Sequence, residues 1–249
     1  MNDFDHLYVE ELPDRLVVTL ADSRAGRGVS EGAVAELHEV CLSLEVDPRL
    51  LLLTGFDGGG PSSGRESPEV HEHGCDDAEH SVTSRLFTRI RRLPMPTLAA
   101  VDGRALGGGA ALAYACDVRI ATERAVFGSP VPGCGVLSAV SACWSLSQLV
   151  GESLAMQMLL AGRRLDPAAA LTAGLVLAVI PAGQLLDHCH SLLDRMNRMS
   201  PQALRLTKLV AVNPGSSPSE ALAQRLWPRR PGEGEPRATW FLPRQKGWM

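Results

Sequence analysis

The stretch GRALGGGAALAYACDVRIA, residues 103–121, decides the fold. Three consecutive glycines, Gly107 to Gly109, stand directly before an apolar segment that carries no carboxylate, amine, guanidinium or imidazole until Asp117. A glycine-rich turn between a strand and a helix lets backbone N–H groups point at an anion, with the positive end of the helix behind them. The pattern therefore indicates a site for phosphate or an oxyanion, with close helix packing as the alternative reason for the glycines.

Nucleotide phosphate loops find no support in this stretch. The G-x-G-x-x-G pattern fails because Leu112 stands where its third glycine would be, and the chain contains no G-x-x-x-x-G-K-[ST] pattern. An oxyanion, rather than a nucleotide phosphate, is therefore the expected partner of the glycines.

The flanking segments predict alternating strands and helices. Residues 95–103 (MPTLAAVDG) have the pattern of a strand that ends in a turn, and residues 117–130 (DVRIATERAVFGSP) that of a strand pair. Upstream, buried strands within residues 14–22 and 49–56 flank a helix for which Ser30 is the N-cap candidate. This order of elements predicts an α/β fold with parallel strand pairing.

Beyond about residue 140 the pattern turns helical and strands have nearly run out. The helical segments are residues 139–151, 153–162, 166–175, 183–200 and 200–212. The tail from Trp227 to Met249 is so rich in Pro, Gly and Arg that regular structure is not expected there. We therefore divide the chain into a core, residues 1–190, and a helical C-terminal region, residues 191–249, that ends in this irregular tail.

The composition predicts a globular protein without a polyanionic partner. With 249 residues and 45% hydrophobic content, the chain can bury a large core. A net charge of -4 provides no basic field for nucleic acid or for an anionic membrane. Six cysteines without a CxxC pair indicate neither a zinc knuckle nor a disulfide framework, so we expect a cytoplasmic protein.

The N-terminal residues are too charged for a secretory signal, and residues 168–180 are shorter than the roughly 20 residues of a membrane helix.

A second glycine-bearing loop, residues 50–67 (LLLLTGFDGGGPSSGRES), follows a predicted strand. Together the two loops resemble those of the crotonase, or enoyl-CoA hydratase/isomerase, superfamily. Residues 96–109 (PTLAAVDGRALGGG) match the family's second loop, P-x-I-A-A-V-x-G-x-A-x-G-G-G, almost fully. The first loop keeps L-T-G and Gly64, but has Pro61 for a phenylalanine, Ser63 for an alanine and Glu66 for an aspartate.

The resemblance implies a spiral of strand-strand-helix (ββα) repeats with a helical C-terminal region that mediates trimerisation, as a homotrimer or a dimer of trimers. It also implies an acyl thioester substrate, carried by coenzyme A or by an acyl carrier protein. The coenzyme A or phosphopantetheine arm belongs to the substrate, and no separate cofactor is expected. The two oxyanion-hole donors carried over are the backbone N–H groups of Ser63 and Gly108, beside Gly64 and Gly107. Such a hole stabilises an enolate.

Hydratases of the family carry two glutamates, and the matching positions here are Ala111 and Val131. Neither side chain can activate water or move a proton. The position where some isomerases and dehalogenases place an aspartate is Ala139, which is equally inert. Decarboxylation makes a lighter demand, because loss of carbon dioxide generates the enolate without a base. The sequence therefore predicts a lyase that decarboxylates a glutaconyl-type acyl thioester, as in the polyketide β-branching members that this chain resembles.

Two alternatives stay open: a hydratase or isomerase with displaced catalytic groups, and a non-catalytic homologue that only binds acyl thioesters. Under the decarboxylase hypothesis, Arg65 is the candidate that holds the substrate carboxylate, and His71 and His73 are further candidates. A solvated arginine paired with an acid and a polar surface loop are the competing interpretations. The same loop offers no scaffold for a closed metal site, and no metal is expected.

Overall fold

The fold is built on a mixed sheet. The computed structural model describes residues 4–21, 29–57, 82–129 and 140–212. Within these ranges, a six-stranded sheet has the order β1-β2-β3-β4-β6-β8. Its strands are β1 (Leu7–Glu11), β2 (Arg15–Leu20), β3 (Leu50–Asp57), β4 (Thr97–Asp102), β6 (Val118–Thr122) and β8 (Ala178–Ile180). The β1–β2 pair is antiparallel and every later pair is parallel, in agreement with the predicted α/β class.

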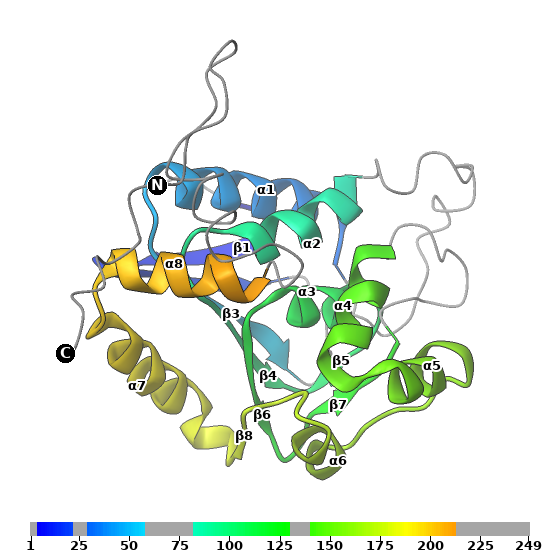
Figure 1. Cartoon of the computed structure of the whole chain (residues 1–249). Coiled ribbons are helices and arrows are strands. Elements are labelled where there is room, and N and C mark those ends of the chain that lie inside the picture. Colours follow the sequence, from blue (N-terminus) through cyan, green and yellow to red (C-terminus); the bar gives the residue numbers. More distant parts are fainter. Residues whose placement is uncertain (1–3, 22–28, 58–81, 130–139, 213–249) are drawn as a thin grey trace, which may run out of the picture. The chain divides into compact units, whose positions relative to one another are not determined.

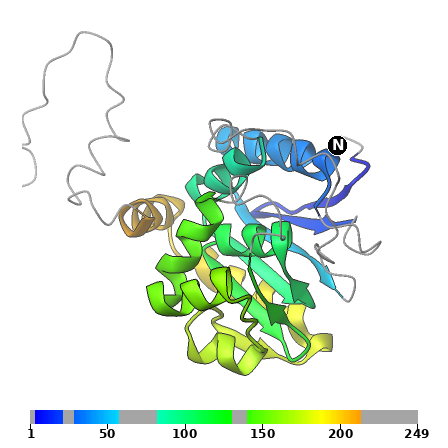
Figure 2. The ribbon, with the colours of Figure 1, turned by 90° about the vertical axis from the view of Figure 1, so that its right-hand side faces the viewer.

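The helices lie on both faces of this sheet (Figure 1). They are α1 (Glu31–Val46), α2 (Val82–Arg92), α3 (Gly107–Ala115), α4 (Val140–Val150), α5 (Glu152–Leu160), α6 (Pro167–Thr172), α7 (Leu185–Asn197) and α8 (Pro201–Val212), with a 3-10 turn at Ala182–Gln184. The helix α3 contacts α2 and α4, and Figure 2 shows it enclosed within the fold. All residues of α3 except Gly108 are buried.

Alternation along the central strands explains the two faces. Successive side chains of a strand point to opposite sides, so a run of apolar residues feeds two cores. In β3, Leu51 and Leu53 join the core made with α1, α2 and α3, whereas Leu50 and Leu52 join the core made with α7. The continuous apolar run of β3 is thus the pattern of a strand covered on both faces.

Two residues have local roles that the structure explains, one at a helix cap and one within a strand. Ser30 is the N-cap of α1, and its Oγ accepts a hydrogen bond from Ala33 N at 3.1 Å, which confirms the predicted cap. Gly55 in β3 has φ +94°, and a β-carbon there would lie 2.6 Å from Leu20 N. Only glycine permits this approach of β3 to β2. The register between β3 and β4 shifts beside it, between Leu53 and Phe56.

The segment predicted to form a strand pair, residues 117–130, places its two strands in different sheets. It forms two strands, as expected, but β6 belongs to the six-stranded sheet, whereas β7 (Val126–Phe127) pairs with β5 (Arg104–Ala105) in a separate two-stranded sheet. The side-chain pattern identifies strands but does not choose their partners, because pairing is set by contacts distant in sequence. This small sheet borders the glycines of α3.

The chain divides into two compact units, residues 1–208 and residues 209–249, and the second is described only over residues 209–212. The functional division expected at residue 190 stays a prediction. No helix in the described part of the chain is long and apolar enough to cross a membrane.

Candidate active site

The N-terminus of α3 presents one open backbone amide. Gly107 has φ +52°, a left-handed conformation that glycine adopts without strain, and its N–H donates to Ser129 O at 2.9 Å. The Gly109 N–H turns back to Leu106 O at 3.1 Å. The Gly108 N–H lies between these two and has no acceptor among the residues that the structure describes. Because it stands at the positive end of α3, it is suited to an oxygen that carries or gains negative charge.

Gly108 also explains why this position carries no side chain. A β-carbon at Gly108 would lie 3.3 Å from both Cβ and Cγ2 of Val29, the residue before the cap of α1. Close packing and an open amide are therefore not competing explanations for this glycine. The absent side chain permits the approach of α3 to Val29, and within the described ranges no acceptor occupies the amide.

The rest of α3 contributes no group that could move a proton at neutral pH. The residues from Ala110 to Tyr114 are fully buried, and Ala111 stands one turn after the glycines. Tyr114 bears the helix's titratable side chain, and complete burial raises its pKa well above the usual value. The phenol therefore stays protonated, and the first turns of α3 offer a backbone donor and an apolar wall.

The predicted site residues fall into two groups. The structure places Gly107, Gly108 and Ala111 on the first two turns of α3, and their role in a site stays a prediction. The remaining predicted site residues lie outside the described residues: Ser63, Gly64, Arg65, His71, His73 and Val131. The second oxyanion donor and the carboxylate-binding arginine therefore stay predictions.

The C-terminal end of α3 is held by a buried arginine that the sequence did not single out. Arg119 on β6 is 5% exposed, and its guanidinium donates to Ala113 O at 3.2 Å and to Cys116 O at 2.6 Å. Its Nε also donates to Leu175 O at 2.6 Å. Burial lowers the pKa of Arg119, and the neighbouring thiol and carboxylate act in the opposite direction. A cation at this end complements the negative pole of the helix.

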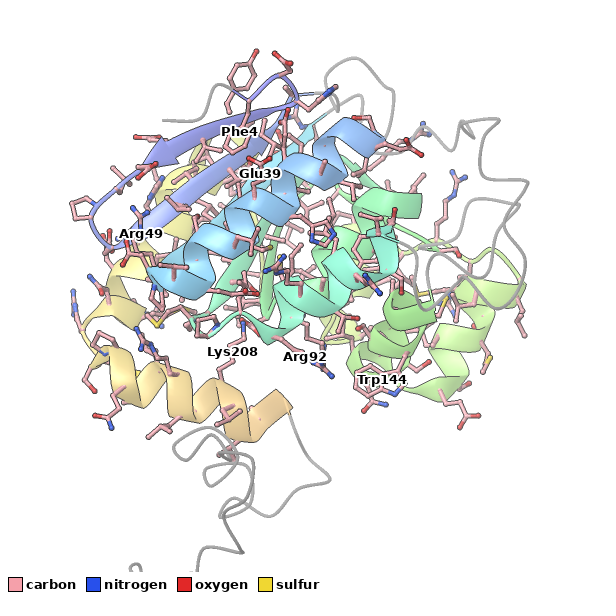
Figure 3. All side chains as sticks on the ribbon, turned by 90° about the horizontal axis from the view of Figure 1, so that it is seen from above. Phe4, Glu39, Arg49, Arg92, Trp144 and Lys208 are labelled. Atoms are coloured by element: carbon pink, nitrogen blue, oxygen red, sulfur yellow. The ribbon has the colours of Figure 1, made fainter. Side chains whose placement is uncertain are left out.

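Asp117, the first acid after the glycines, is bound by groups that hold the fold together. Its Oδ2 accepts from Thr97 N at 2.8 Å, from Thr97 Oγ1 at 3.0 Å and from Lys208 Nζ at 2.6 Å. Lys208 on α8 is buried, points into the fold (Figure 3) and also donates to Met95 O at 3.0 Å. Burial lowers the pKa of Lys208 and Asp117 raises it. A lysine within the apolar segment LRLTKLVAV was the one signal in the sequence for this pair.

In the described residues, no group of three or more His, Cys, Asp and Glu side chains is placed to hold a metal ion.

The comparisons with known proteins concern the family and the fold. The family model described as enoyl-CoA hydratase/isomerase matches residues 16–225. The "Probable enoyl-CoA hydratase echA8" of Mycobacterium bovis is 33% identical over 210 residues, which cover 83% of this chain and 81% of that protein. The structure of Pseudomonas aeruginosa DspI is similar with a TM-score of 0.78 and 27% identity, over 90% of this chain and 93% of the other. A monofunctional enoyl CoA isomerase from M. smegmatis gives a TM-score of 0.71 and 27% identity, over 88% and 98%.

Proposed function

Because this chain belongs to the enoyl-CoA hydratase/isomerase family, whose crotonase fold it shares, we propose that it binds an enoyl-CoA thioester and catalyses hydratase- or isomerase-type chemistry through an enolate. The observation that carries the proposal is the open amide of Gly108 at the positive end of α3. An amide in this position lowers the energy of a thioester oxygen as negative charge develops on it. The names of the similar proteins support the enoyl-CoA substrate.

The proposed site needs a second hydrogen-bond donor and room for the thiol carrier of the substrate. Ser63 N–H is the donor we assign opposite Gly108, and the coenzyme A or phosphopantetheine arm enters as part of the substrate. Proton transfer must come from a group other than the side chain at position 111, because a methyl group cannot exchange a proton. The two reactions differ in what this other group must do. Hydration needs a group that activates water, whereas double-bond isomerisation needs a group that removes a proton and returns it at another carbon.

Decarboxylation of a glutaconyl-type thioester is the second candidate, and Ala111 is the observation that favours it. The residue is fully buried and aliphatic beside the donor amide. An apolar wall destabilises a substrate carboxylate, and carbon dioxide loss produces the enolate without a base. In this reaction Arg65 is the group we assign to the carboxylate, with His71 and His73 as further candidates.

Parallel assays with the purified protein distinguish the candidates. Crotonyl-CoA tests hydration by loss of the ultraviolet absorbance of its conjugated thioester. A 3-enoyl-CoA tests isomerisation, and glutaconyl-CoA tests release of carbon dioxide. Each substrate is also offered on an acyl carrier protein. Turnover of an enoyl-CoA without decarboxylation supports the first proposal, and decarboxylation alone supports the second. The Arg65→Ala variant should then weaken binding of glutaconyl-CoA more than of crotonyl-CoA. If no thioester is turned over or bound, both proposals are wrong.

A further inference from the structure

Tyr114 makes a hydrogen bond that neither the predicted site nor the proposed chemistry uses. The side chain is fully buried on α3, and its hydroxyl donates to Gly128 O at 2.7 Å. The acceptor follows β7 directly and lies one residue before Ser129, whose carbonyl accepts from the Gly107 amide. Two consecutive carbonyls of one segment are thus bound by the same helix.

These two hydrogen bonds join the segment 128–129 to residues of the first and the last turn of α3. The backbone positions of Gly107 and Tyr114 lie seven residues, or about two turns and about 10 Å, apart along the helix axis. The long side chain of Tyr114 reaches back toward the start of α3 and meets the carbonyl next to the one that Gly107 binds. One attachment would leave α3 free to pivot about it. Two attachments, one from the backbone of the first turn and one through a side chain of the last turn, restrict both the tilt of the helix and its rotation about its own axis, and with them the direction of the Gly108 N–H.

The segment that receives these bonds is itself fixed. Gly128 N donates to Ala105 O at 3.1 Å, and Phe127 and Leu165 exchange two backbone hydrogen bonds of 2.9 and 2.8 Å. A β-carbon on Gly128 would lie 2.5 Å from Cδ2 of Leu106, so the segment also packs closely against the residue that precedes α3. Backbone hydrogen bonds and close packing therefore hold Phe127 and Gly128 in place beside α3.

We propose that Tyr114 is a positioning residue of the active site, whose hydroxyl, by holding Gly128 O, aims the Gly108 N–H at the thioester oxygen. The inference rests on the proposed enolate-forming function. Hydrogen bonds weaken steeply as donor and acceptor lose alignment, so a small rotation of α3 costs more at the charged enolate oxygen than at the neutral thioester. Tyr114 acts through Gly108 and does not touch the substrate.

The experiment compares two ligands on the wild type and on the Tyr114→Phe variant. Acetoacetyl-CoA forms an enolate that absorbs in the near ultraviolet and tests the oxyanion site without turnover, whereas butyryl-CoA tests neutral thioester binding. The variant should bind the acetoacetyl-CoA enolate about tenfold more weakly, the scale of one hydrogen bond. Its affinity for butyryl-CoA should remain within about twofold, because a neutral carbonyl gains little from the donor.

Thr97→Val is the matched control for a general loss of packing. Thr97 is 1% exposed, and its hydroxyl donates to Asp117 Oδ2 at 3.0 Å and accepts from Asp117 N at 2.9 Å, away from the glycines. Removal of this hydroxyl should lower the free energy of unfolding and leave enolate binding unchanged. If Thr97→Val weakens enolate binding as much as Tyr114→Phe does, Tyr114 has no specific positioning role.

The outcomes for the two proposals are distinct. A Tyr114→Phe protein that binds the enolate as the wild type does overturns the role of Tyr114 alone. A wild type that binds the enolate no better than butyryl-CoA overturns the proposed function itself.

If the variant does not fold, 3-fluorotyrosine replaces both tyrosines, Tyr8 and Tyr114, in the otherwise native chain. Tyr8, 63% exposed, serves as the internal reference. The fluorine resonance of position 114 should shift with acetoacetyl-CoA and not with butyryl-CoA. Equal response to both ligands, or to neither, contradicts the proposal.

Discussion

At position 108 the chain needs a residue that lacks a side chain and carries an amide hydrogen. The first requirement comes from Val29, which leaves 3.3 Å for a β-carbon, and the second from the proposed oxyanion. Alanine violates only the first requirement, whereas proline violates both, because it has no N–H. The two substitutions therefore separate crowding from loss of the donor.

We expect Gly108→Ala to retain part of the activity and Gly108→Pro to lose about 100-fold more in kcat, the usual effect of deleting one oxyanion donor. Steady-state kinetics on the substrate identified by the thioester assays provides the measurement. Circular dichroism must show both variants folded, since the substitution lies in the first turn of α3. Equal activity of the two variants would show that the Gly108 amide is not a donor in the reaction.

At the scale of elements, buried charges join segments that are distant in sequence. Arg15, at the start of β2, is 5% exposed and forms ion pairs with its neighbour Asp14 and with Asp194 on α7. Its NH1 atom also donates to His190 O at 3.2 Å. Lys208 similarly connects α8 to Asp117, just before β6. Each of the two C-terminal helices α7 and α8 is thus tied to a strand by one buried cation.

The first of these contacts predicts acid sensitivity. The hydrogen bond from Arg15 is the largest cause that holds the pKa of Asp14 below its usual value of 3.8. The folded protein therefore binds fewer protons at Asp14 than the unfolded chain does, and stability is lost as the pH falls through the window below 3.8. Urea unfolding between about pH 6 and pH 2 should show a shallower loss of stability for Asp14→Asn than for the wild type. Parallel curves would contradict this role of Asp14.

The second contact predicts a coupled loss of stability. Lys208→Met leaves Asp117 without its cation and Met95 O without its donor, and should lower the free energy of unfolding by about 1–3 kcal/mol. Asp117→Asn should have a smaller effect in the Lys208→Met background than alone, because the pair is already broken. Urea denaturation of the two single variants and the double variant measures the coupling. Strictly additive effects would show that the two groups do not stabilise each other.

At the scale of the whole molecule, the described surface exposes large apolar side chains on consecutive helices. Trp144 lies on α4 (Figure 3), where Arg91 stacks over its ring at 5.1 Å, and Met156 and Leu160 lie on α5. Leu160 is 81% exposed. Exposed apolar side chains that gather on neighbouring elements are typical of protein interfaces.

We expect the chain to assemble into a trimer or a dimer of trimers through its helical C-terminal region, as its resemblance to the crotonase family implies, and the exposed residues of α4 and α5 are a further surface that assembly can cover. Sedimentation velocity at micromolar concentration should give a species of three or six chains. Salt should have little effect on this species, because apolar contacts are not screened. A stable monomer under these conditions would contradict the expectation and leave the exposed side chains without an explanation.

The sequence by itself determined the features that depend on local chemistry. The apolar runs predicted the strands and the α/β class, Ser30 predicted a helix cap, and the glycines predicted an amide site at the start of α3, because periodicity and backbone freedom act over a few residues. Only the tertiary structure decided which strands pair and which partners meet. The separation of β6 from β7, the contact of Tyr114 with Gly128 and the pair of Asp117 with Lys208 join residues far apart in the chain. Such contacts leave no periodic trace in a single sequence, since they are chosen by the packing of whole elements.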